Sequence, residues 1–254
     1  MAKMSTARQE KTDRMTSHTL LDSNTHRDLR ICVDAGADLG DGVMATLVVP
    51  SEFRRVQADF PILFRRETGR ELFFAVALLG FETGENLFLD GARWDGGYRP
   101  LSLAIQPFLI GRPPGGEGSG QVHIDLAHPR IAQDGDEGVR LFDSEGRPTP
   151  FLDAIADRLG ELDEGYRGSG AFFDALAEHE LLEPFTFEVM LDDGSLHSLV
   201  GFHIIDEARL RALDAAALGA LHAAGHLMPI FMALASLSQL AELARRKNRR
   251  RRDG

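Results

Sequence analysis

The sequence contains very little cysteine. Cys32 is the only one among 254 residues, so no disulfide can form within the chain and zinc sites built from several cysteines are excluded. The residues that flank Cys32 in RICVDAG are largely apolar. This setting favours a buried structural thiol over a reactive nucleophile.

Long apolar runs are also missing. The first 28 residues, MAKMSTARQEKTDRMTSHTLLDSNTHRD, contain no apolar segment of the kind that a secretory signal requires. No window reaches the roughly 18 consecutive apolar residues that a transmembrane helix needs. These absences predict a cytoplasmic protein with no membrane span.

The usual catalytic and nucleotide-binding motifs are absent as well. No Gly-x-Gly-x-x-Gly links a strand to a helix, and Ser169 in RGSGAF lacks the glycine offsets of a Gly-x-Ser-x-Gly elbow. The loop GRPPGGEGSG (111–120) contains no lysine and leads into a strand pattern, so it indicates a flexible connection and not a phosphate-binding loop. The 39 carboxylates are too many for composition to single out an acid–base pair. We expect no cofactor, and whether the chain is an enzyme stays open.

The net charge of −11 is unevenly distributed. The last ten residues, RRKNRRRRDG, carry seven basic groups and one acid, and subtracting their +6 leaves −17 on the other 244 residues. An acidic body argues against nucleic acid as the main ligand, because phosphate binding needs a basic face. The basic end is predicted to be a solvated, frayed continuation of a helix; contact with an anionic partner is the alternative.

Composition divides the chain into three parts. Residues 1–24 are polar and predicted to be a disordered arm, residues 25–246 a single domain, and residues 247–254 a basic tail. Apolar patterns predict strands over 43–50, 61–67, 71–81, 121–126, 185–191 and 195–205. The segment 71–81 is apolar on both faces, which places it centrally in a sheet. The turn residues at 192–194 make the last two strands a hairpin.

Apolar residues three and four apart predict the helices. Thr149, followed by proline, marks the start of one helix, and a second segment is expected beyond Gly165. Asp206 and Asp214 are natural N-caps of two short helices, and a final helix is predicted over about 229–246. Strands and helices without regular βαβ alternation indicate the α+β class, with antiparallel sheets and hairpins packed against a C-terminal group of helices.

A first histidine pattern that could bind a metal is H-x-x-x-H, formed by His222 and His226. On one helix this spacing would place both imidazoles on one face. Gly225 is expected to end the helix between them, and no glutamate lies inside the motif to act as a base. These two features argue against a metal site here.

A second pattern is H-x-D on a predicted strand, formed by His123 and Asp125. Both side chains would point to the same face, as in a two-His-one-carboxylate iron site. The missing histidine would have to come from His197 or His203. The pattern is short and common by chance, so no metal ligands are predicted.

The segment ENLFLDGARWDGGYRP (85–100) gathers planar and hydrogen-bonding side chains and holds the only tryptophan. The candidate ligand-binding residues are Asn86, Asp90, Trp94, Asp95 and Tyr98. An aromatic face surrounded by amides and carboxylates suits a sugar or peptide ligand. The residue types favour an architectural alternative, in which Trp94 and its apolar neighbours enter the core, Asn86 and Asp90 satisfy backbone groups in turns, and the glycines allow tight bends.

Four stretches of the chain carry a family resemblance. They are PILFRRETGRELFFAVALLGFETGENLFLDGARWDGGYRP with the Pro-Phe that follows, LFDSEGRPTPFL, LLEPFTFEVMLDDGSLHSLVGFHIIDEARLRAL, and LHAAGHLMPIFMALASLSQLAELARR. Together they resemble the SapC family of bacterial proteins, over roughly residues 25–246. The chain departs from the family pattern at Met232 and Ala233, where the closing helix of relatives often carries a histidine, and in an expanded loop at 111–120.

The resemblance implies a non-catalytic accessory role in a bacterial surface, uptake or peptide-modification system. Relatives tend to be encoded beside TonB-dependent outer-membrane receptors and flavin-dependent halogenase-like proteins, and the family name comes from an association with surface-layer proteins. The implied binding partner is a peptide, a glycan-derived ligand or a protein of such a system. A peptide-modifying enzyme and an S-layer structural protein are the alternatives, and no catalytic residues carry over.

Overall fold

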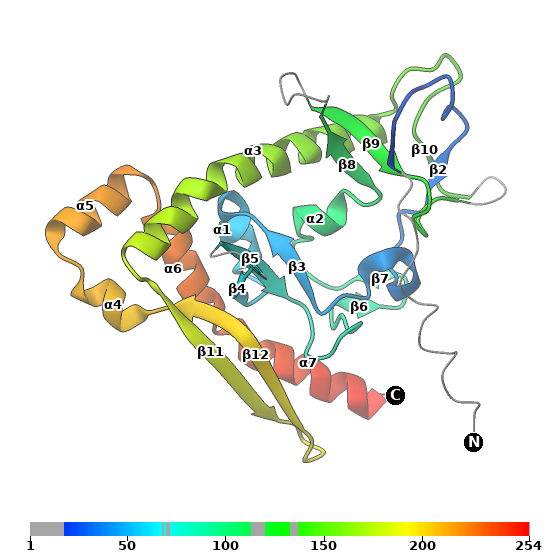
Figure 1. Ribbon diagram of the computed structural model, residues 1–254. Helices are drawn as coiled ribbons and strands as arrows, with labels where there is room; N and C mark the ends of the chain where they lie inside the picture. Colours follow the sequence, from blue (N-terminus) through cyan, green and yellow to red (C-terminus); the bar gives the residue numbers. More distant parts are fainter. Residues whose placement is uncertain (1–17, 68, 70–71, 113–119, 133–136, 254) are drawn as a thin grey trace, which may run out of the picture. The chain divides into compact units, whose positions relative to one another are not determined.

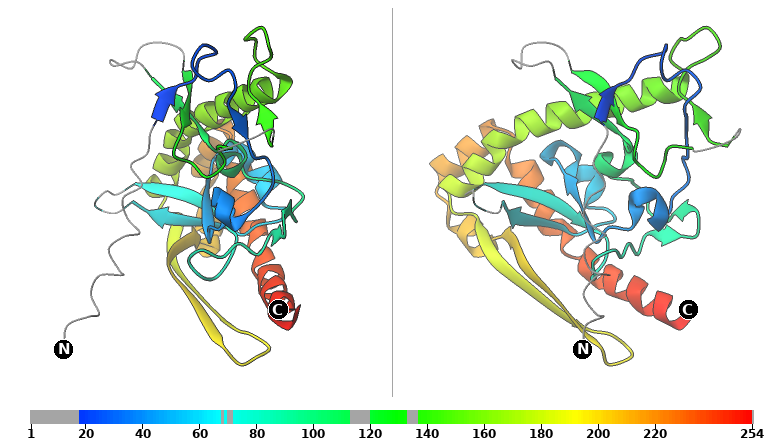
Figure 2. Two further views of the ribbon diagram at one scale, coloured as in Figure 1. Left: turned by 90° about the vertical axis from the view of Figure 1, so that its right-hand side faces the viewer. Right: turned by 45° about the vertical axis from the view of Figure 1, so that its right-hand side comes forward.

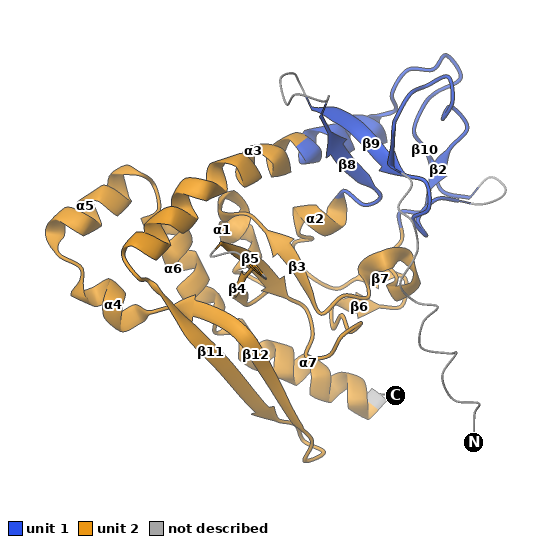
Figure 3. Ribbon diagram, in the orientation of Figure 1, with its two compact units in different colours: residues 1–33, 105–159 blue, residues 34–104, 160–254 orange. Residues whose placement is uncertain are grey.

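The computed structural model describes residues 18–67, 69, 72–112, 120–132 and 137–253 (Figure 1). Two compact units make up the chain (Figure 3): unit 1 contains residues 1–33 and 105–159, and unit 2 contains residues 34–104 and 160–254. Antiparallel sheets and a C-terminal group of helices confirm the predicted α+β class. Residues 1–17 of the predicted arm and residues 113–119 of the predicted glycine-rich loop lie outside the described residues.

Unit 1 contains a three-stranded and a two-stranded antiparallel sheet. The larger sheet has the order β1-β9-β8, with the bounds His18–Leu20, Gln121–Asp125 and Phe108–Gly111. The smaller one pairs β2 (Arg30–Ile31) with β10 (Val139–Arg140). Since β1 begins at His18, regular structure starts before the boundary at residue 24 that the sequence suggested. Cys32 is half-buried, so the expectation of a buried thiol was too strong.

The sheet of unit 2 has five strands in the order β11-β12-β4-β5-β3, each antiparallel to its neighbours. In that order their bounds are Leu182–Met190, Leu196–Ile205, Ile62–Arg66, Phe73–Leu78 and Ala45–Val48. As its continuous apolar pattern predicted, β5 lies inside the sheet, between β4 and β3. The predicted hairpin is β11–β12, and Gly194 in its turn has a φ of 81°, which glycine adopts without strain.

Two helices of unit 2 pack near this sheet and against each other. α1 (Phe53–Val56) follows the 3-10 turn η2 (Pro50–Glu52), and α6 (Leu227–Ser236) packs against α1, β4 and β12. The buried ring of Phe53 lies edge-on to Phe64 of β4 and to Phe172, at centroid distances of 6.4 and 6.1 Å. These aromatic contacts join strand and helix in one core.

The two predicted N-caps precede the short helices α4 (Glu207–Ala212) and α5 (Ala215–Ala223). Asp206 and Asp214 each accept a backbone N–H three residues further on, at 2.8 Å, which confirms both caps. α5 ends as expected at Gly225, whose φ is 75°. The N–H of His226 donates to Leu221 O at 2.9 Å, the bond that closes a Schellman turn.

The helix that begins after Thr149 is one element, α3 (Pro150–Glu178), where the sequence suggested two. Gly165 lies inside it and does not break it. A Cβ at this position would come within 2.6 Å of Ser51 Oγ and 2.7 Å of a Val49 methyl. The glycine therefore allows η2 to approach the helix backbone closely, which a helical period cannot reveal.

The C-terminal helix is two elements, α6 and α7 (Gln239–Asp253), which follow one another along unit 2 (Figure 2). By length and hydropathy alone, residues 227–252 form the one helical stretch of the described residues that could cross a membrane. The criterion of an unbroken apolar run misses it because Ser, Gln and Glu interrupt the run. Core helices pass the same test, and the stretch buries Ile230, Ala233, Leu240 and Leu243 in the core.

Candidate functional site

The segment 85–100 forms a small antiparallel ribbon in unit 2, with β6 (Leu89–Asp90) paired to β7 (Arg93–Trp94). Gly91, at the tight turn between the strands, has a φ of 58°. Residues before and after the ribbon run close to the core, and Leu87, Phe88 and Leu89 are buried. The glycine-rich composition therefore reflects bends, as the architectural alternative predicted.

Asn86 and Trp94 hold the ribbon in place. Asn86 is 2% exposed; its Nδ2 donates to Asp41 O at 2.8 Å, and its Oδ1 accepts the Phe88 N–H at 2.9 Å. The indole N–H of Trp94 donates to Tyr98 O at 2.8 Å, while its ring stacks on Phe88. Trp94 is partly buried, and Phe88 and the guanidinium of Arg99, which is 5.7 Å from the ring centroid, lie against its ring, where a sugar would have to stack.

Tyr98 is part of a buried hydrogen-bond network around Glu52. Glu52 is fully buried and its carboxylate accepts the Val49 N–H (3.0 Å), the Tyr98 hydroxyl (2.7 Å) and the Leu101 N–H (3.1 Å). Burial raises the pKa of Glu52, although the three donors oppose this effect. Burial and the neighbouring carboxylate also raise the pKa of Tyr98. The Tyr98 N–H donates to Asp59 at 2.9 Å, so this residue too is structural.

The two aspartates of the candidate set differ from each other. Asp95 accepts a hydrogen bond from Arg246 of α7 at 2.6 Å, and its own N–H donates to Phe88 O at 2.7 Å. Asp90 is 69% exposed and pairs with Arg93, itself 76% exposed, at 3.1 Å. Asp95 keeps 56% of its side chain exposed despite its bond to Arg246, so both aspartates present most of their side chain to solvent, Asp90 more so.

The basic end of the chain is helical and contacts this ribbon. Lys247 is 6% exposed and its ammonium group bonds to Glu85 and, at 3.2 Å, to Glu82. Arg250 donates to Asn86 O at 2.7 Å and to Leu89 O at 3.0 Å. The prediction of a solvated, frayed end was wrong, because α7 continues to Asp253 and four of its basic side chains bind carboxylates or carbonyls far away in the sequence.

The tip of the hairpin is bound to α7 as well. Asp192 and Asn248 exchange two hydrogen bonds, of 3.1 and 2.9 Å, and Arg251 pairs with Asp193. A polar pocket of about 230 Å³ lies among these residues. Both of its acidic groups are already bonded to side chains of α7, so it offers a ligand no free carboxylate.

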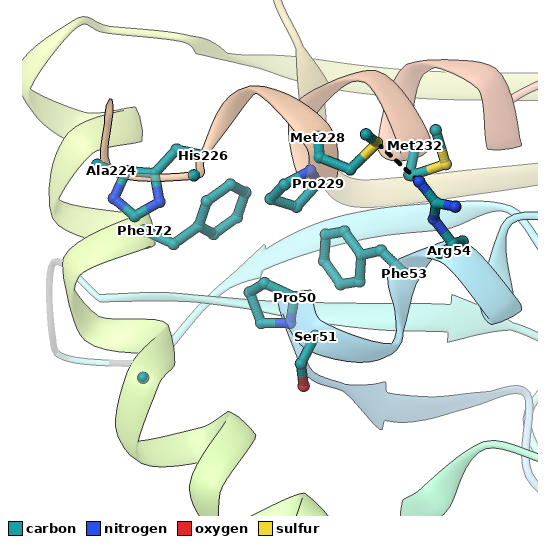
Figure 4. A pocket seen from close by; sticks show the side chains of 12 residues that line it. Pro50, Ser51, Phe53, Arg54, Phe172, Ala224, His226, Met228, Pro229 and Met232 are labelled. Carbon is teal, nitrogen blue, oxygen red and sulfur yellow. Dashed lines mark hydrogen bonds between the residues drawn. The ribbon is translucent and has the colours of Figure 1, made fainter. Parts of the chain in front are cut away.

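A second pocket of unit 2 has a volume of about 400 Å³, within the range of small-molecule sites (Figure 4). Its walls come from η2, α1, the middle of α3 and the turn that joins α5 to α6. Buried rings of Phe53 and Phe172 form an apolar floor, and Met228, Pro229 and Met232 of α6 extend it. No residue of the segment 85–100 lines either pocket.

Three polar residues line this pocket: Ser51, Arg54 and His226. Arg54 lies at one end beside Met228 and Met232, and His226 at the other end beside Phe172 (Figure 4). The His226 ring stands edge-on to Phe172 at 5.7 Å. The lining contains no carboxylate.

Over residues 21–243 the sequence matches the family model named SapC. The chain belongs to the SapC family. This confirms the resemblance read from the sequence motifs. No match was found among curated proteins or among solved structures.

The metal patterns of this SapC-family chain do not assemble. Gly225 separates His222 from His226, so the two imidazoles do not share a helix face. His123 and Asp125 belong to β9, whereas His197 and His203 lie on β12 of a different sheet. Across the described residues no three His, Cys, Asp or Glu side chains form a group that could hold a metal.

Residues that matter in the SapC-family fold were missed by the sequence analysis. Glu52, Asp41 and Lys247 are buried charges whose partners are distant in sequence, and nothing in the local pattern marks them. The pocket was missed for the same reason, since it joins residues near 50, 170 and 228. One signal pointed towards it: Met232, where the chain departs from the family pattern, lines its wall.

Proposed function

We propose that this SapC-family protein is a non-catalytic binding protein and that its ligand site is the pocket of η2, α1, α3 and α6. The observation that carries the proposal is the 400 Å³ cavity itself, which has a buried apolar floor and a partly exposed rim. Phe53 and Phe172 are 0% and 1% exposed, whereas Met228 at the rim is 49% exposed. A preformed apolar cavity with a few polar groups is the usual form of a small-ligand site.

The contacts of the segment 85–100 argue against the earlier candidate site. Asn86, Trp94, Asp95 and Tyr98 all bond to the protein itself. A ligand that used the donors and acceptors of Asn86, Trp94 and Tyr98 would have to break these bonds, and each would cost about 1 kcal/mol or more. The apolar pocket needs no such change, and it suits an apolar peptide or small molecule better than a sugar.

The polar groups of the pocket support binding over catalysis. A nucleophile needs a base within hydrogen-bond reach, and that base needs an orienting acid. Ser51 and His226 lie at separate places around the pocket (Figure 4), and the lining supplies no carboxylate to orient the imidazole. A peptide-modifying enzyme remains the alternative function.

The wider setting is proposed from the family resemblance. We propose a cytoplasmic accessory protein whose partner belongs to a system of TonB-dependent uptake or flavin-dependent halogenase-like proteins. Fractionation of the native cells and identification of co-purifying proteins test this. Recovery of the protein from the cell surface as an assembled layer would support the S-layer alternative instead.

The pocket is tested by filling it from the helix that forms its wall. Gly168 of α3 lines the cavity and a Cβ there would meet no atom within 4 Å, so a Gly168→Leu side chain has room to enter. Gly170→Leu is the matched control, because it is the same change on the same helix at an open position outside the lining. Each change should raise helix stability by up to about 1 kcal/mol.

The probe is Nile red, a neutral apolar dye whose emission reports burial. Wild-type protein and Gly170→Leu should bind it equally. Gly168→Leu should bind it at least about tenfold more weakly, the equivalent of ~1.4 kcal/mol of steric conflict. Equal dye binding by all three proteins, or none by the wild type, would reject the pocket as a ligand site.

A further inference from the structure

The pocket has an unbalanced positive charge. Arg54 of α1 projects at its rim, and the hydrogen bond of its guanidinium runs to Met228 Sδ at 3.7 Å. Within the described ranges no carboxylate forms an ion pair with Arg54. Neighbouring arginines differ: Arg55 pairs with Glu161, and Arg99 pairs with the buried Asp41 at 2.6 Å.

The bond from Arg54 to Met228 is weak. A thioether sulfur is a poor acceptor, and it carries no negative charge to match the guanidinium. A carboxylate would offer two oxygens in the geometry of the guanidinium fork, which gives a stronger, charge-assisted pair. An anionic group at this place would therefore replace the sulfur at little cost.

A second feature of the pocket favours negative charge. The N-terminus of α6 adjoins it, and the N-cap residue His226 makes no hydrogen bond from its side chain to the first turn. The positive end of the helix dipole is thus not neutralised by a side chain. Arg54 lies at the opposite end of the cavity, and no acid in the lining balances its charge.

We infer that the ligand is an organic anion: one carboxylate carried on an apolar body. This inference rests on the proposed function of the pocket. The carboxylate pairs with Arg54 at the rim, and the body lies along Phe53, Pro229 and Phe172, the row of rings between Arg54 and His226 (Figure 4). A single guanidinium matches a monocarboxylate, whereas a phosphate dianion would call for more than one cation.

The test measures displacement of bound Nile red by two amphiphiles of equal length, decanoate and decylammonium. Decanoate should bind the wild type at least about tenfold more tightly than decylammonium. Arg54→Gln should weaken decanoate binding by about tenfold to a hundredfold, the value of a charged hydrogen-bond pair, and should weaken binding of the neutral dye far less. Arg158→Gln on α3 is the control, since it also removes one exposed arginine but lies outside the pocket.

A further pair of probes identifies the source of the carboxylate. An N-acetylated apolar dipeptide with a free C-terminus is compared with the same dipeptide as its amide. Preference for the free acid over the amide points to a peptide C-terminus, and preference for decanoate over both points to a free alkyl acid.

The outcomes separate this inference from the function on which it rests. Suppose that Nile red binds and Gly168→Leu blocks it, but decanoate binds no better than decylammonium. The pocket is then still a ligand site, and the inference that its ligand is an organic anion is wrong. Equal decanoate affinity in wild type and Arg54→Gln overturns the inference in the same way. Failure of decanoate to displace the dye at all also overturns it.

Discussion

Lys247 gives the sharpest test of how the C-terminal helix contributes to this fold. The side chain is 7% exposed and bridges two carboxylates of the loop after β5, Glu85 (13% exposed) and Glu82 (53% exposed). The Lys247→Met substitution keeps the volume and the helix propensity close to those of lysine but removes the charge. It leaves Glu85 largely buried without its cation.

The expected loss of stability follows from the burial of the two carboxylates. Removing one partner of a buried ion pair costs about 3–5 kcal/mol, whereas an exposed pair contributes about 1 kcal/mol or less. Water can reach Glu82 but hardly Glu85. We therefore expect Lys247→Met to lower the free energy of unfolding by about 3 kcal/mol, the lower end of the range for a buried ion pair. For a chain of this size that corresponds to a fall in melting temperature of roughly 6–12 °C.

The assay is urea unfolding of wild type, Lys247→Met and Arg249→Met. Arg249 lies two residues further along α7, is 50% exposed and pairs with Glu242 at 2.9 Å. Its substitution removes the same charge from the same helix and should cost no more than about 1 kcal/mol. Adding Glu85→Gln to Lys247→Met should restore at least ~1 kcal/mol, because the unpaired buried charge is removed.

The loss of stability caused by Lys247→Met also depends on pH, and its direction can be predicted. The hydrogen bond from Lys247 lowers the pKa of Glu82 below its ordinary value of 4.5. A carboxyl group whose pKa is lower in the folded state stabilises the protein above its ordinary pKa, and this contribution disappears as the pH falls through the folded value. The difference between wild type and Lys247→Met should therefore shrink below about pH 4.5. If Lys247→Met and Arg249→Met lower the free energy of unfolding by equal, small amounts at neutral pH, α7 does not pack against these carboxylates and is solvated instead.

Two further predictions concern residues that are structural in this fold. Asn86→Ala should cost about 1–3 kcal/mol because it leaves the buried Phe88 N–H without its acceptor and removes one of the two hydrogen bonds to Asp41 O. Asp90→Ala should change the free energy of unfolding by less than ~0.5 kcal/mol, and similar losses in urea unfolding would contradict the contrast. Gly225→Ala should lower the melting temperature because a left-handed residue with a Cβ costs about 1–2 kcal/mol, while Gly219→Ala, inside α5, should raise it. A shift of both melting temperatures in the same direction would show that the φ of Gly225 does not control the turn.

Much of the fold follows from patterns that are local in the sequence. The continuous apolar run at 71–81 predicted an inner strand, and the turn residues at 192–194 predicted the hairpin. Asp206, Asp214 and Gly225 marked helix ends, because caps and left-handed turns depend on the residues within one turn of the chain. Such features need no knowledge of what packs against them.

The predictions that failed are those in which a distant segment decides the outcome. Gly165 reads as a break, but it lies inside α3, where the approach of Ser51 and Val49 leaves no room for a side chain. The run of basic residues reads as a solvated tail, but α7 is placed against carboxylates more than 150 residues away in the sequence. In both cases the deciding contact has no trace in the local pattern.

The sequence by itself determined the class of this protein, its family, the caps and the positions of the five strands in the sheet of unit 2, because each of these depends on residue type and near neighbours. Only the tertiary structure decided what the segment ENLFLDGARWDGGYRP does and where a ligand could bind. Its asparagine, tryptophan and tyrosine bond inward, and the open cavity lies elsewhere, among residues near 50, 170 and 228. Side-chain direction and the meeting of distant segments are set by packing, and packing is a property of the folded chain as a whole.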